Sequence, residues 1–166
     1  IDSDIQGGQN DAGGIAGTVN GGLIENCMVL DGEVKIPGAM PRLGNAGGIA
    51  GGLYEGGIVR NCFVDQTIDS PNNGGGIAGN IDETGGIENC YYNSEKTEAA
   101  VGRTKTMTGA LNSDTIKDIS NFIGFDFNNV WTKDEEGNIT IATVFGRGTE
   151  ESPYIIRTES DWYNVG

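Results

Sequence analysis

One segment of about eighteen residues occurs three times in this chain, and it constrains the fold more than any other feature. The copies read GGIAGTVNGGLIENCMV at Gly13–Val29, GGIAGGLYEGGIVRNCFV at Gly47–Val64 and GGIAGNIDETGGIENCYY at Gly75–Tyr92. Their equivalent cysteines follow one another after 35 and 28 residues, and periods of this length are typical of proteins built from stacked repeats. Because a repeated unit is first a building block, the pattern indicates architecture before it indicates chemistry.

The composition of the repeats excludes helices and favours short strands. The chain has 29 glycines, many of them in doublets inside the repeats, and each Gly costs a helix about 1 kcal/mol relative to Ala. Short β-branched stretches between Gly doublets suit short strands joined by tight turns. We therefore predict a mainly β fold, a right-handed parallel β-helix (β-solenoid) of about three coils, in which each repeat supplies one coil.

Each coil is predicted to contain three strands. The first strand is centred on the isoleucine of each GGIAG motif, namely Ile15, Ile49 and Ile77. The second strand runs through the Asn-Cys pair of each unit, at Ile24–Val29, Val59–Val64 and Ile87–Tyr92. The third uses the more variable segments Glu33–Ile36 and Asp65–Ile68, where the differences in repeat length fall, as expected for loops that tolerate insertions.

The Asn-Cys pair predicts a bend in the second strand. Simple alternation places Ile24 and Asn26 inside and Cys27 outside, whereas a free cysteine prefers burial. Asparagine tolerates left-handed backbone, so a bend there turns Cys27 inward and Met28 outward. Stacking then produces two structural ladders, whose asparagines are predicted to hydrogen bond from coil to coil and whose cysteines are predicted to be buried free thiols. The ladders are Asn26, Asn61 and Asn89, and Cys27, Cys62 and Cys90.

Charge and hydropathy exclude two classes of partner. The net charge is −14, from 24 acidic and 10 basic side chains without a basic run, so the chain repels nucleic acid and anionic membrane surfaces. No apolar run approaches the roughly 20 residues needed to span a bilayer. We therefore expect no nucleic-acid partner and no membrane insertion. The chain begins with Ile1 and shows no signal peptide, so we expect a piece of a longer protein whose other domains are also partners.

The residue types give little support to catalysis or to a metal site. The chain lacks His, the commonest general base and transition-metal ligand, and it has no CxxC pair for zinc. The acidic stretches around Asp65–Asn73 and Asp134–Glu136 match neither an EF-hand nor the GGxGxD calcium repeat. Glycoside hydrolysis needs two carboxylates at a fixed separation, and Arg60 stands between Glu25 and Glu88 in the repeat order. We predict no catalytic residues, no metal and no cofactor.

The three units resemble the GLUG repeat, a Gly-rich motif of bacterial surface proteins with the form GGIxG followed by GGxIxNCYx. This family occurs in immunoglobulin A-specific peptidases and in adhesins, outside their catalytic domains. The landmarks GRTKTMT at Gly102–Thr108 and GFDFNNVW at Gly124–Trp131 also resemble the segment that often follows such repeats. The resemblance implies a β-solenoid on an extracellular protein, secreted or attached to the cell wall, and it carries over no catalytic residues.

The chain after the repeats is predicted to form a cap. We divide the chain into GLUG-type β-solenoid repeats at 1–106, a helix plus hairpin at 107–145, and a segment at 146–166 that either begins a following module or adds a final strand. The apolar spacing within Thr108–Phe122 predicts a short helix. Thr132–Val144 predicts a hairpin with its turn at Asp134–Asn138. The aromatic residues Phe125, Phe127 and Trp131 are expected to close the end of the solenoid.

Two sets of outward positions form the predicted partner-binding surface. One is an apolar stripe, Met28, Phe63 and Tyr91, and the other is the charged set Glu25, Arg60 and Glu88. An exposed apolar stripe binds ligands or partners, unless the helix or loops of the same chain cover it. Our first hypothesis is a non-catalytic extracellular structural or adhesion module that binds a host or matrix protein or a glycan. The alternative is a carbohydrate-binding or polysaccharide-processing β-helix domain.

Overall fold

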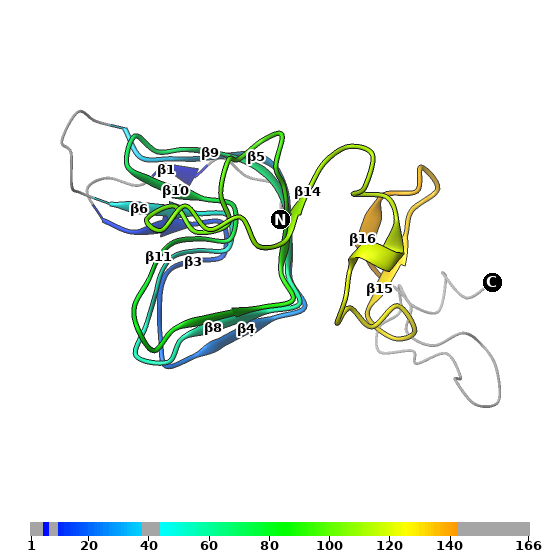
Figure 1. Cartoon of the computed structure of the whole chain (residues 1–166), viewed down its shortest axis with the longest axis horizontal. Helices are drawn as coiled ribbons and strands as arrows, with labels where there is room; N and C mark the ends of the chain where they lie inside the picture. Colours follow the sequence, from blue (N-terminus) through cyan, green and yellow to red (C-terminus); the bar gives the residue numbers. More distant parts are fainter. Residues whose placement is uncertain (1–4, 7–9, 38–43, 143–166) are drawn as a thin grey trace, which may run out of the picture.

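The computed structural model of the chain describes residues 5–6, 10–37 and 44–142. Within these ranges the protein is mainly β, and the single helical element is a short 3-10 turn, η1 (Ile119–Asn121). Figure 1 shows a stack of layers with a smaller C-terminal part beside it. The predicted mainly β character is confirmed.

Each repeat supplies one layer made of four short strands. The first layer contains β2 (Ala12–Gly13), β3 (Ala16–Asn20), β4 (Leu23–Glu25) and β5 (Met28–Lys35). The second contains β6 (Asn45–Gly47), β7 (Ala50–Tyr54), β8 (Ile58–Arg60) and β9 (Phe63–Asp69). The third contains β10 (Asn73–Gly75), β11 (Ala78–Ile81), β12 (Gly86–Glu88) and β13 (Tyr91–Asn93).

Equivalent strands of successive layers pair in parallel, and like residues lie opposite one another. The sheets have the orders β10-β6-β2, β11-β7-β3 and β12-β8-β4, and a fourth runs β1-β5-β9-β13-β14, where β1 is Ile5–Gln6 and β14 is Ala110–Leu111. From the second layer to the third the offset stays at 28 residues, from Asn45↔Asn73 to Phe63↔Tyr91. In Figure 1 the equivalent strands accordingly lie one behind another. This parallel arrangement is compatible with the predicted β-solenoid.

The isoleucines of the GGIAG motifs lie at corners of the layers, not at the centres of strands. Ile49 and Ile77 are fully buried between two strands, and the Ile49 amide donates to the Ile77 carbonyl at 3.0 Å. The preceding glycine makes this corner possible, because a Cβ on Gly48 would lie 2.1 Å from the Gly76 carbonyl oxygen of the next layer. The predicted position of the first strand was therefore wrong, although its isoleucines do fill the interior.

The predicted bend at the asparagines is confirmed. Asn26, Asn61 and Asn89 adopt left-handed φ angles of 53°, 50° and 48°. Each of them lies between two strands, so the segment predicted as one strand is two strands that meet at a corner. Beyond the bend, Cys62 and Cys90 are buried in the core.

A partial fourth layer follows the three repeats, and the repeat pattern did not predict it. The amide of Gly76 donates to the Ala99 carbonyl at 2.7 Å, and that of Ile77 donates to the Ala100 carbonyl at 2.9 Å. Strand β14 then pairs with β13. Residues 99–101 thus continue the corner of the layers below, with Ala100 at the place of Ile77 and Val101 opposite Ala78. The glycine doublet and the isoleucine of the repeats are missing at this corner, which hides the relationship in the sequence.

The C-terminal part contains the predicted hairpin but not the predicted helix. Strands β15 (Trp131–Lys133) and β16 (Ile139–Ile141) pair antiparallel around a turn at Asp134–Asn138. The helix predicted over Thr108–Phe122 is replaced by β14, turns and η1. The Asn112 side chain accepts from the amides of Asp114 and Thr115, both at 3.1 Å, and such local side-chain bonds compete with a helix.

This C-terminal part covers the side of the stack and not its end. Its aromatic residues form one buried cluster with outward side chains of β9 and β13, and Figure 1 shows the part beside those strands. The cluster comprises Phe63, Tyr91, Leu111, Phe122, Phe125, Trp131 and Ile139. The prediction that the C-terminal aromatic residues close the end of the stack was wrong. They pack instead on the apolar side chains that point outward from β9 and β13. Val144 and residues 146–166 lie outside the described residues, and the predicted domain boundaries remain predictions.

Candidate functional site

The apolar part of the predicted binding surface is covered by the chain itself. Phe63 is 3 % exposed and Tyr91 is 9 % exposed, while Met28 is half-buried at the edge of the same cluster. The ring of Phe122 meets Phe63 edge-on at a centroid distance of 5.6 Å, and the Tyr91 hydroxyl donates to the Ile123 carbonyl at 3.1 Å. The buried Phe63 and Tyr91 are therefore not a surface for an external partner. The cover by the same chain, which we weighed as the alternative, is the observed arrangement.

The charged part of the predicted surface lies on the outside of the stack. Arg60 lies between two glutamates of the neighbouring layers, with Nη2 2.7 Å from Glu25 Oε2 and Nη1 3.8 Å from Glu88 Oε2. The hydrogen bond from Arg60 to Glu25 raises the pKa of the Arg60 guanidinium. All three side chains are about two-fifths to one-half exposed. They form a charge ladder across three layers, in which opposite charges alternate.

The cysteine ladder lies in the core and its members are free thiols. Cys62 and Cys90 are buried and Cys27 is half-buried at the end of the ladder. The contact with the Cys90 thiol and burial raise the pKa of Cys62, and burial also raises the pKa of Cys27. Because the thiolate is the reactive form, the raised pKa values make the Cys27 and Cys62 thiols less reactive. The contact with Cys62 lowers the pKa of Cys90, whose burial limits the access of reagents.

We expect thiol reagents to distinguish Cys27 from the other two cysteines. In the native protein Cys27 should react first, and Cys62 and Cys90 should react on the order of 100-fold more slowly, because their reaction requires an opening of the structure. Timed alkylation with mass spectrometry measures the rates, and Cys27→Ser is the control that removes the fast phase. Fewer than three titratable thiols in the unfolded, unreduced chain would contradict the assignment of free cysteines.

The predicted asparagine ladder provides bends but no chain of amide hydrogen bonds. Within the described residues, no hydrogen bond joins the side chains of Asn26, Asn61 and Asn89, and Asn61 Oδ1 is buried without a partner. The Asn89 side chain packs against the C-terminal part, where a Cβ on Gly124 would lie 2.3 Å from its Nδ2. The role of these asparagines is therefore conformational.

A different polar ladder links the layers, and the sequence analysis missed it. Asn73 Nδ2 donates to Asn45 Oδ1 at 2.7 Å, and Asn45 Nδ2 donates to Asp11 Oδ1 at 2.6 Å. The Tyr54 hydroxyl donates to Asp11 Oδ2 at 3.1 Å and accepts from Asn80 Nδ2 at 3.2 Å, and burial raises the pKa of this tyrosine. The signal was available, because Asp or Asn occurs two residues before the glycine doublet of GGIAG in every unit.

One turn of the third layer is fixed by a carboxylate. Asp82 accepts from the amides of Glu55 at 2.9 Å, of Thr84 at 2.8 Å and of Gly85 at 2.8 Å. These hydrogen bonds, with that from the Glu55 amide the largest cause, lower the pKa of Asp82 to about 2. The first of them crosses from the third layer to the second.

We expect Asp82 to contribute to acid unfolding. Its folded pKa of about 2 lies below the ordinary value of about 3.9 for an unfolded aspartate. The stabilisation is therefore present above about pH 4 and is lost as the pH falls through about 2. Urea denaturation at pH 5, 3 and 2 should give Asp82→Asn a shallower loss of stability than the unsubstituted chain. Equal pH slopes for the two proteins would contradict this role.

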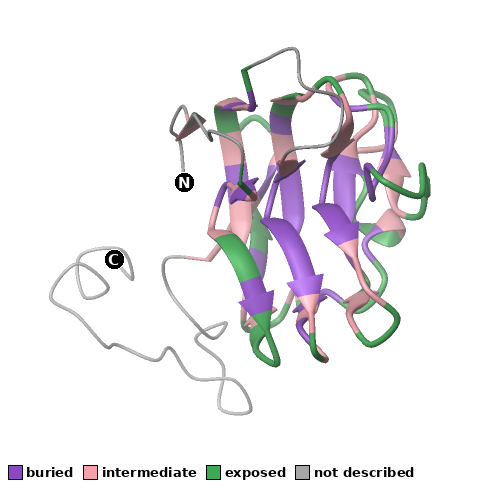
Figure 2. Ribbon diagram, turned by 90° about the vertical axis from the view of Figure 1, so that its left-hand side faces the viewer, coloured by how far each residue is buried: buried purple, intermediate pink, exposed green. Residues whose placement is uncertain are grey.

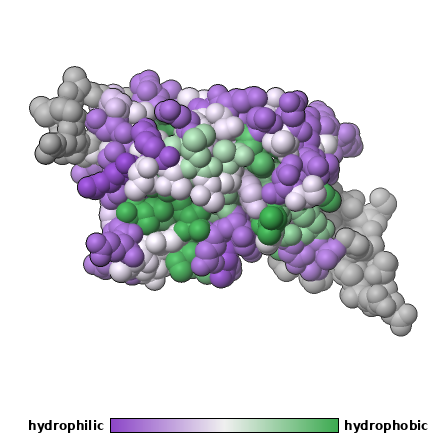
Figure 3. All heavy atoms as spheres, in the orientation of Figure 1, coloured by the Kyte–Doolittle hydropathy of each residue, from purple (hydrophilic) through white to green (hydrophobic). Residues whose placement is uncertain are grey.

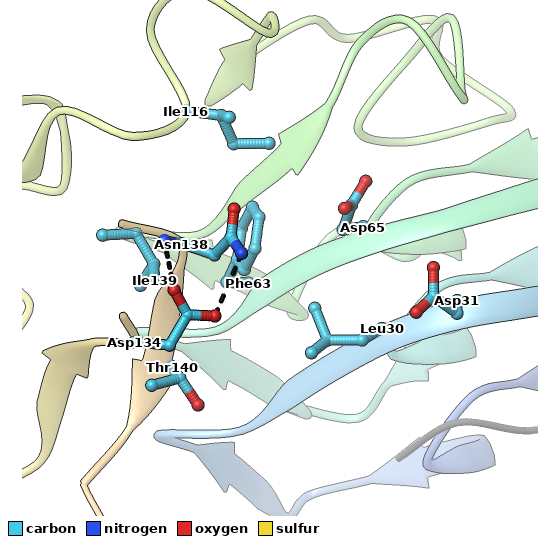
Figure 4. Close-up of a pocket in the computed structure, with 9 residues that line it drawn as sticks. All are labelled: Leu30, Asp31, Phe63, Asp65, Ile116, Asp134, Asn138, Ile139 and Thr140. Carbon is cyan, nitrogen blue, oxygen red and sulfur yellow. Dashed lines mark hydrogen bonds between the residues drawn. The ribbon is translucent and has the colours of Figure 1, made fainter. Parts of the chain in front are cut away.

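A groove separates the stack from the C-terminal hairpin. It has a volume of about 320 Å³ and lies between β5 and β9 on one side and the hairpin on the other. Figure 4 shows the residues that line it, which are Leu30, Asp31, Phe63, Asp65, Ile116, Asp134, Asn138, Ile139 and Thr140. Apolar side chains and carboxylates share this lining, which suits a ligand with both polar and apolar parts.

The groove carboxylates already have partners within the chain. Asp65 Oδ1 accepts from Asn93 Nδ2 at 2.9 Å and lies 3.0 Å from Lys96 Nζ. Asp134 accepts from the Asn138 amide at 2.8 Å and from Asn138 Nδ2 at 3.0 Å, the contacts drawn in Figure 4. These bonds account for the local structure on both walls of the groove without any bound group. In the described ranges, no cluster of three or more His, Cys, Asp or Glu side chains is arranged to hold a metal ion.

A second, smaller cavity of about 210 Å³ lies at the end of the stack. It is lined by Ile81, Ile87, Ala100, Val101, Thr104, Thr106 and Thr108. Figure 3 shows hydrophobic residues at the surface of this end among hydrophilic ones. The cavity forms because the fourth layer crosses from its corner to β14 without a strand beside β12.

Comparisons with known proteins add no family assignment. Searches of protein-family models, of curated proteins and of solved structures found no match to this chain. The part of the chain that the structure describes contains no helix of the length and apolar character needed to cross a membrane.

Proposed function

We propose that this chain is a non-catalytic extracellular module, a rigid segment of a larger bacterial surface protein with a structural or adhesive role. We further propose that its layers form a right-handed parallel β-solenoid of about three coils. The observation that carries the proposal is the parallel pairing of all four strand types with their equivalents, in a register that is constant between the second and third layers. Such stacking gives a rod whose stability comes from neighbour contacts.

The repeated residues support a structural role, because each residue type has an identifiable function in forming the layers. Glycines permit close corners, as at Gly48, and the isoleucines and cysteines fill the interior. Asparagines supply the left-handed bends, and the ladder through Asp11, Asn45 and Asn73 ties neighbouring layers. The resemblance to GLUG repeats supports a secreted or wall-attached location, with a host or matrix protein or a glycan as partner.

A duplicated repeat tests the modular rod. Copying residues 45–72 and inserting the copy before Asn73 preserves the 28-residue register, so the stack should gain one layer of about 4.8 Å. Small-angle X-ray scattering measures the length, and hydrogen exchange measures whether the new amides are protected. A 28-residue Gly-Ser insert at the same place is the matched control and should give unprotected amides. Unprotected amides in the duplicated repeat would count against the proposal.

The groove favours one alternative, a carbohydrate-binding or polysaccharide-processing domain. Its walls combine apolar side chains, Leu30 among them, with carboxylates, Asp65 among them, and glycan sites commonly combine apolar and polar groups. A glycan array together with a turnover screen on acidic polysaccharides separates the two functions. Turnover that is abolished by Asp65→Asn, with the fold retained, would overturn the non-catalytic proposal.

A further inference from the structure

The first layer has an open edge on the side away from the second layer. Strands β2, β3 and β4 pair with β6, β7 and β8, and no described strand lies on their other side. In Figure 2 the strand at this edge is accordingly less buried than the two strands beside it. Leu23 is 49 % exposed here, and Ile24 is half-buried although its equivalent Val59 is fully buried. Among the residues that the structure describes, this edge therefore has no strand over the kind of surface that the second layer buries.

The fourth sheet already extends past this edge. Strand β1 pairs in parallel with β5, so that Ile5 lies opposite Val34, which in turn lies opposite Ile68 of β9. Thus β1 occupies the place that the end of a β5-type strand would take in a preceding layer. A repeat unit that continued into β1 would lay its other strands along β2, β3 and β4.

The charge ladder determines which unit fits there. Arg60 donates from Nε at 3.2 Å and from Nη2 at 2.7 Å to the same Glu25 oxygen, Oε2, and Oε1 has no partner among the described residues. The equivalent side chain of another layer would lie about 4.8 Å away. A cation there would be attracted to Glu25, whereas a carboxylate would be repelled by it. A second copy stacked through its Glu88 layer would bring two glutamates together, and the net charge of −14 adds to that repulsion.

We propose that the edge formed by β2, β3 and β4 is a docking surface for a further Gly-Gly-Ile repeat unit that carries Arg or Lys at the position of Glu25. The charge at this position determines which units can stack as neighbours. Within the chain the same rule is met by the alternation of Glu25, Arg60 and Glu88. The inference rests on the proposed solenoid and specifies the partner of its open edge.

The test extends the chain by one unit of known sequence. A copy of residues 45–67 is joined directly before Ile5, so that Thr67 of the copy precedes Ile5 as Thr67 precedes Ile68 in the chain. Three forms of the extended chain are compared, and they differ at one residue of the copy. This residue, the counterpart of Arg60, is arginine in the first form and is changed by Arg60→Gln in the second and by Arg60→Glu in the third. Amide hydrogen exchange of β3 and β4 is measured at low salt and at 1 M salt.

The arginine form should slow exchange of the β3 and β4 amides by about tenfold or more, because these strands become internal. The glutamine and glutamate forms should protect them progressively less, with about fivefold between arginine and glutamate at low salt. This difference should largely disappear at 1 M salt, where exposed charges are screened. Absence of added protection in all three forms, or equal protection at low salt, overturns the proposal.

Amide hydrogen exchange of β7 distinguishes a failure of the docking proposal from a failure of the proposed solenoid. If the β7 amides exchange freely in the unextended chain, the solenoid itself fails. If they are protected and β3 and β4 gain nothing, only the docking proposal fails. Should an extension disrupt β7, the three units are supplied as peptides to the unextended chain, and the same order of β3 and β4 protection decides the result.

Discussion

Replacing Gly47 with alanine is expected to destabilise the folded chain by about 3 kcal/mol, a large effect for the addition of one methyl group. A Cβ at this position would lie 1.8 Å from the Ala50 carbonyl oxygen and 2.8 Å from the Ala78 Cα of the next layer. Both neighbours are backbone atoms, so no side-chain rotation can relieve the overlap, and the backbone of this corner and its contact with the next layer would have to shift. Urea denaturation followed by circular dichroism measures the change in the free energy of unfolding.

Gly86→Ala is the matched control for this substitution. Gly86 also lies in a strand of the stack, β12, but the nearest atom to its Cβ would be Ile58 Cγ1 at 3.9 Å. The change in stability should stay within about 0.5 kcal/mol. Equal losses for the two substitutions would show that close packing between the layers is not what requires Gly47.

Trp131→Ala is expected to destabilise the C-terminal part by about 3 to 5 kcal/mol. Trp131 is 1 % exposed, and its ring stacks on Phe125 at a centroid distance of 4.2 Å. Loss of this ring should free the cover from the stack and expose Phe63 and Tyr91, while the layers keep their own core. Hydrogen exchange should therefore show fast exchange in β15 and β16 with β7 still protected, and binding of a hydrophobic dye should increase.

An exposed residue of the same region provides the control for Trp131. Ile123 is 72 % exposed, so Ile123→Ala should change stability by less than about 0.5 kcal/mol. If Trp131→Ala instead removed the protection of β7 as well, the aromatic cluster and the interior of the layers would unfold as one cooperative unit, which would contradict this prediction.

The layers could be predicted well from the sequence because three copies of the repeat can be compared position by position. Asn26, Asn61 and Asn89 occupy the same position in the three repeats, and each is followed by a cysteine. Strict strand alternation would turn these cysteines outward, so only a bend allows them to be buried, and that bend is present. The corner at Ile49 was harder to predict. A Gly doublet allows both a tight turn and a close approach of backbones, and only the packing of the next layer against Gly48 distinguishes them.

The C-terminal part was less predictable because local bonds outweigh periodicity there. Ile116, Ile119 and Phe122 have helical spacing, yet Asn112 and Asp118 accept from nearby amides and hold turns instead. The candidate surface failed for a related reason. The outward direction of Phe63 and Tyr91 follows from the repeat, but their cover comes from residues 20 or more positions further along the chain, which no repeat pattern encodes.

The corner of the fourth layer makes the two ends of the stack chemically different. In the repeats, a Cβ on Gly48 or Gly75 would collide with the layer that follows. In the fourth layer the carbonyl of Ala99 accepts from Gly76 as that of Gly75 accepts from Gly48, and Ala99 carries a side chain that is fully buried. An open row of strands invites uncontrolled pairing with other chains. The corner at this end therefore carries side chains where the inner corners have glycine, and the two ends of the stack present different rows of backbone groups to another chain.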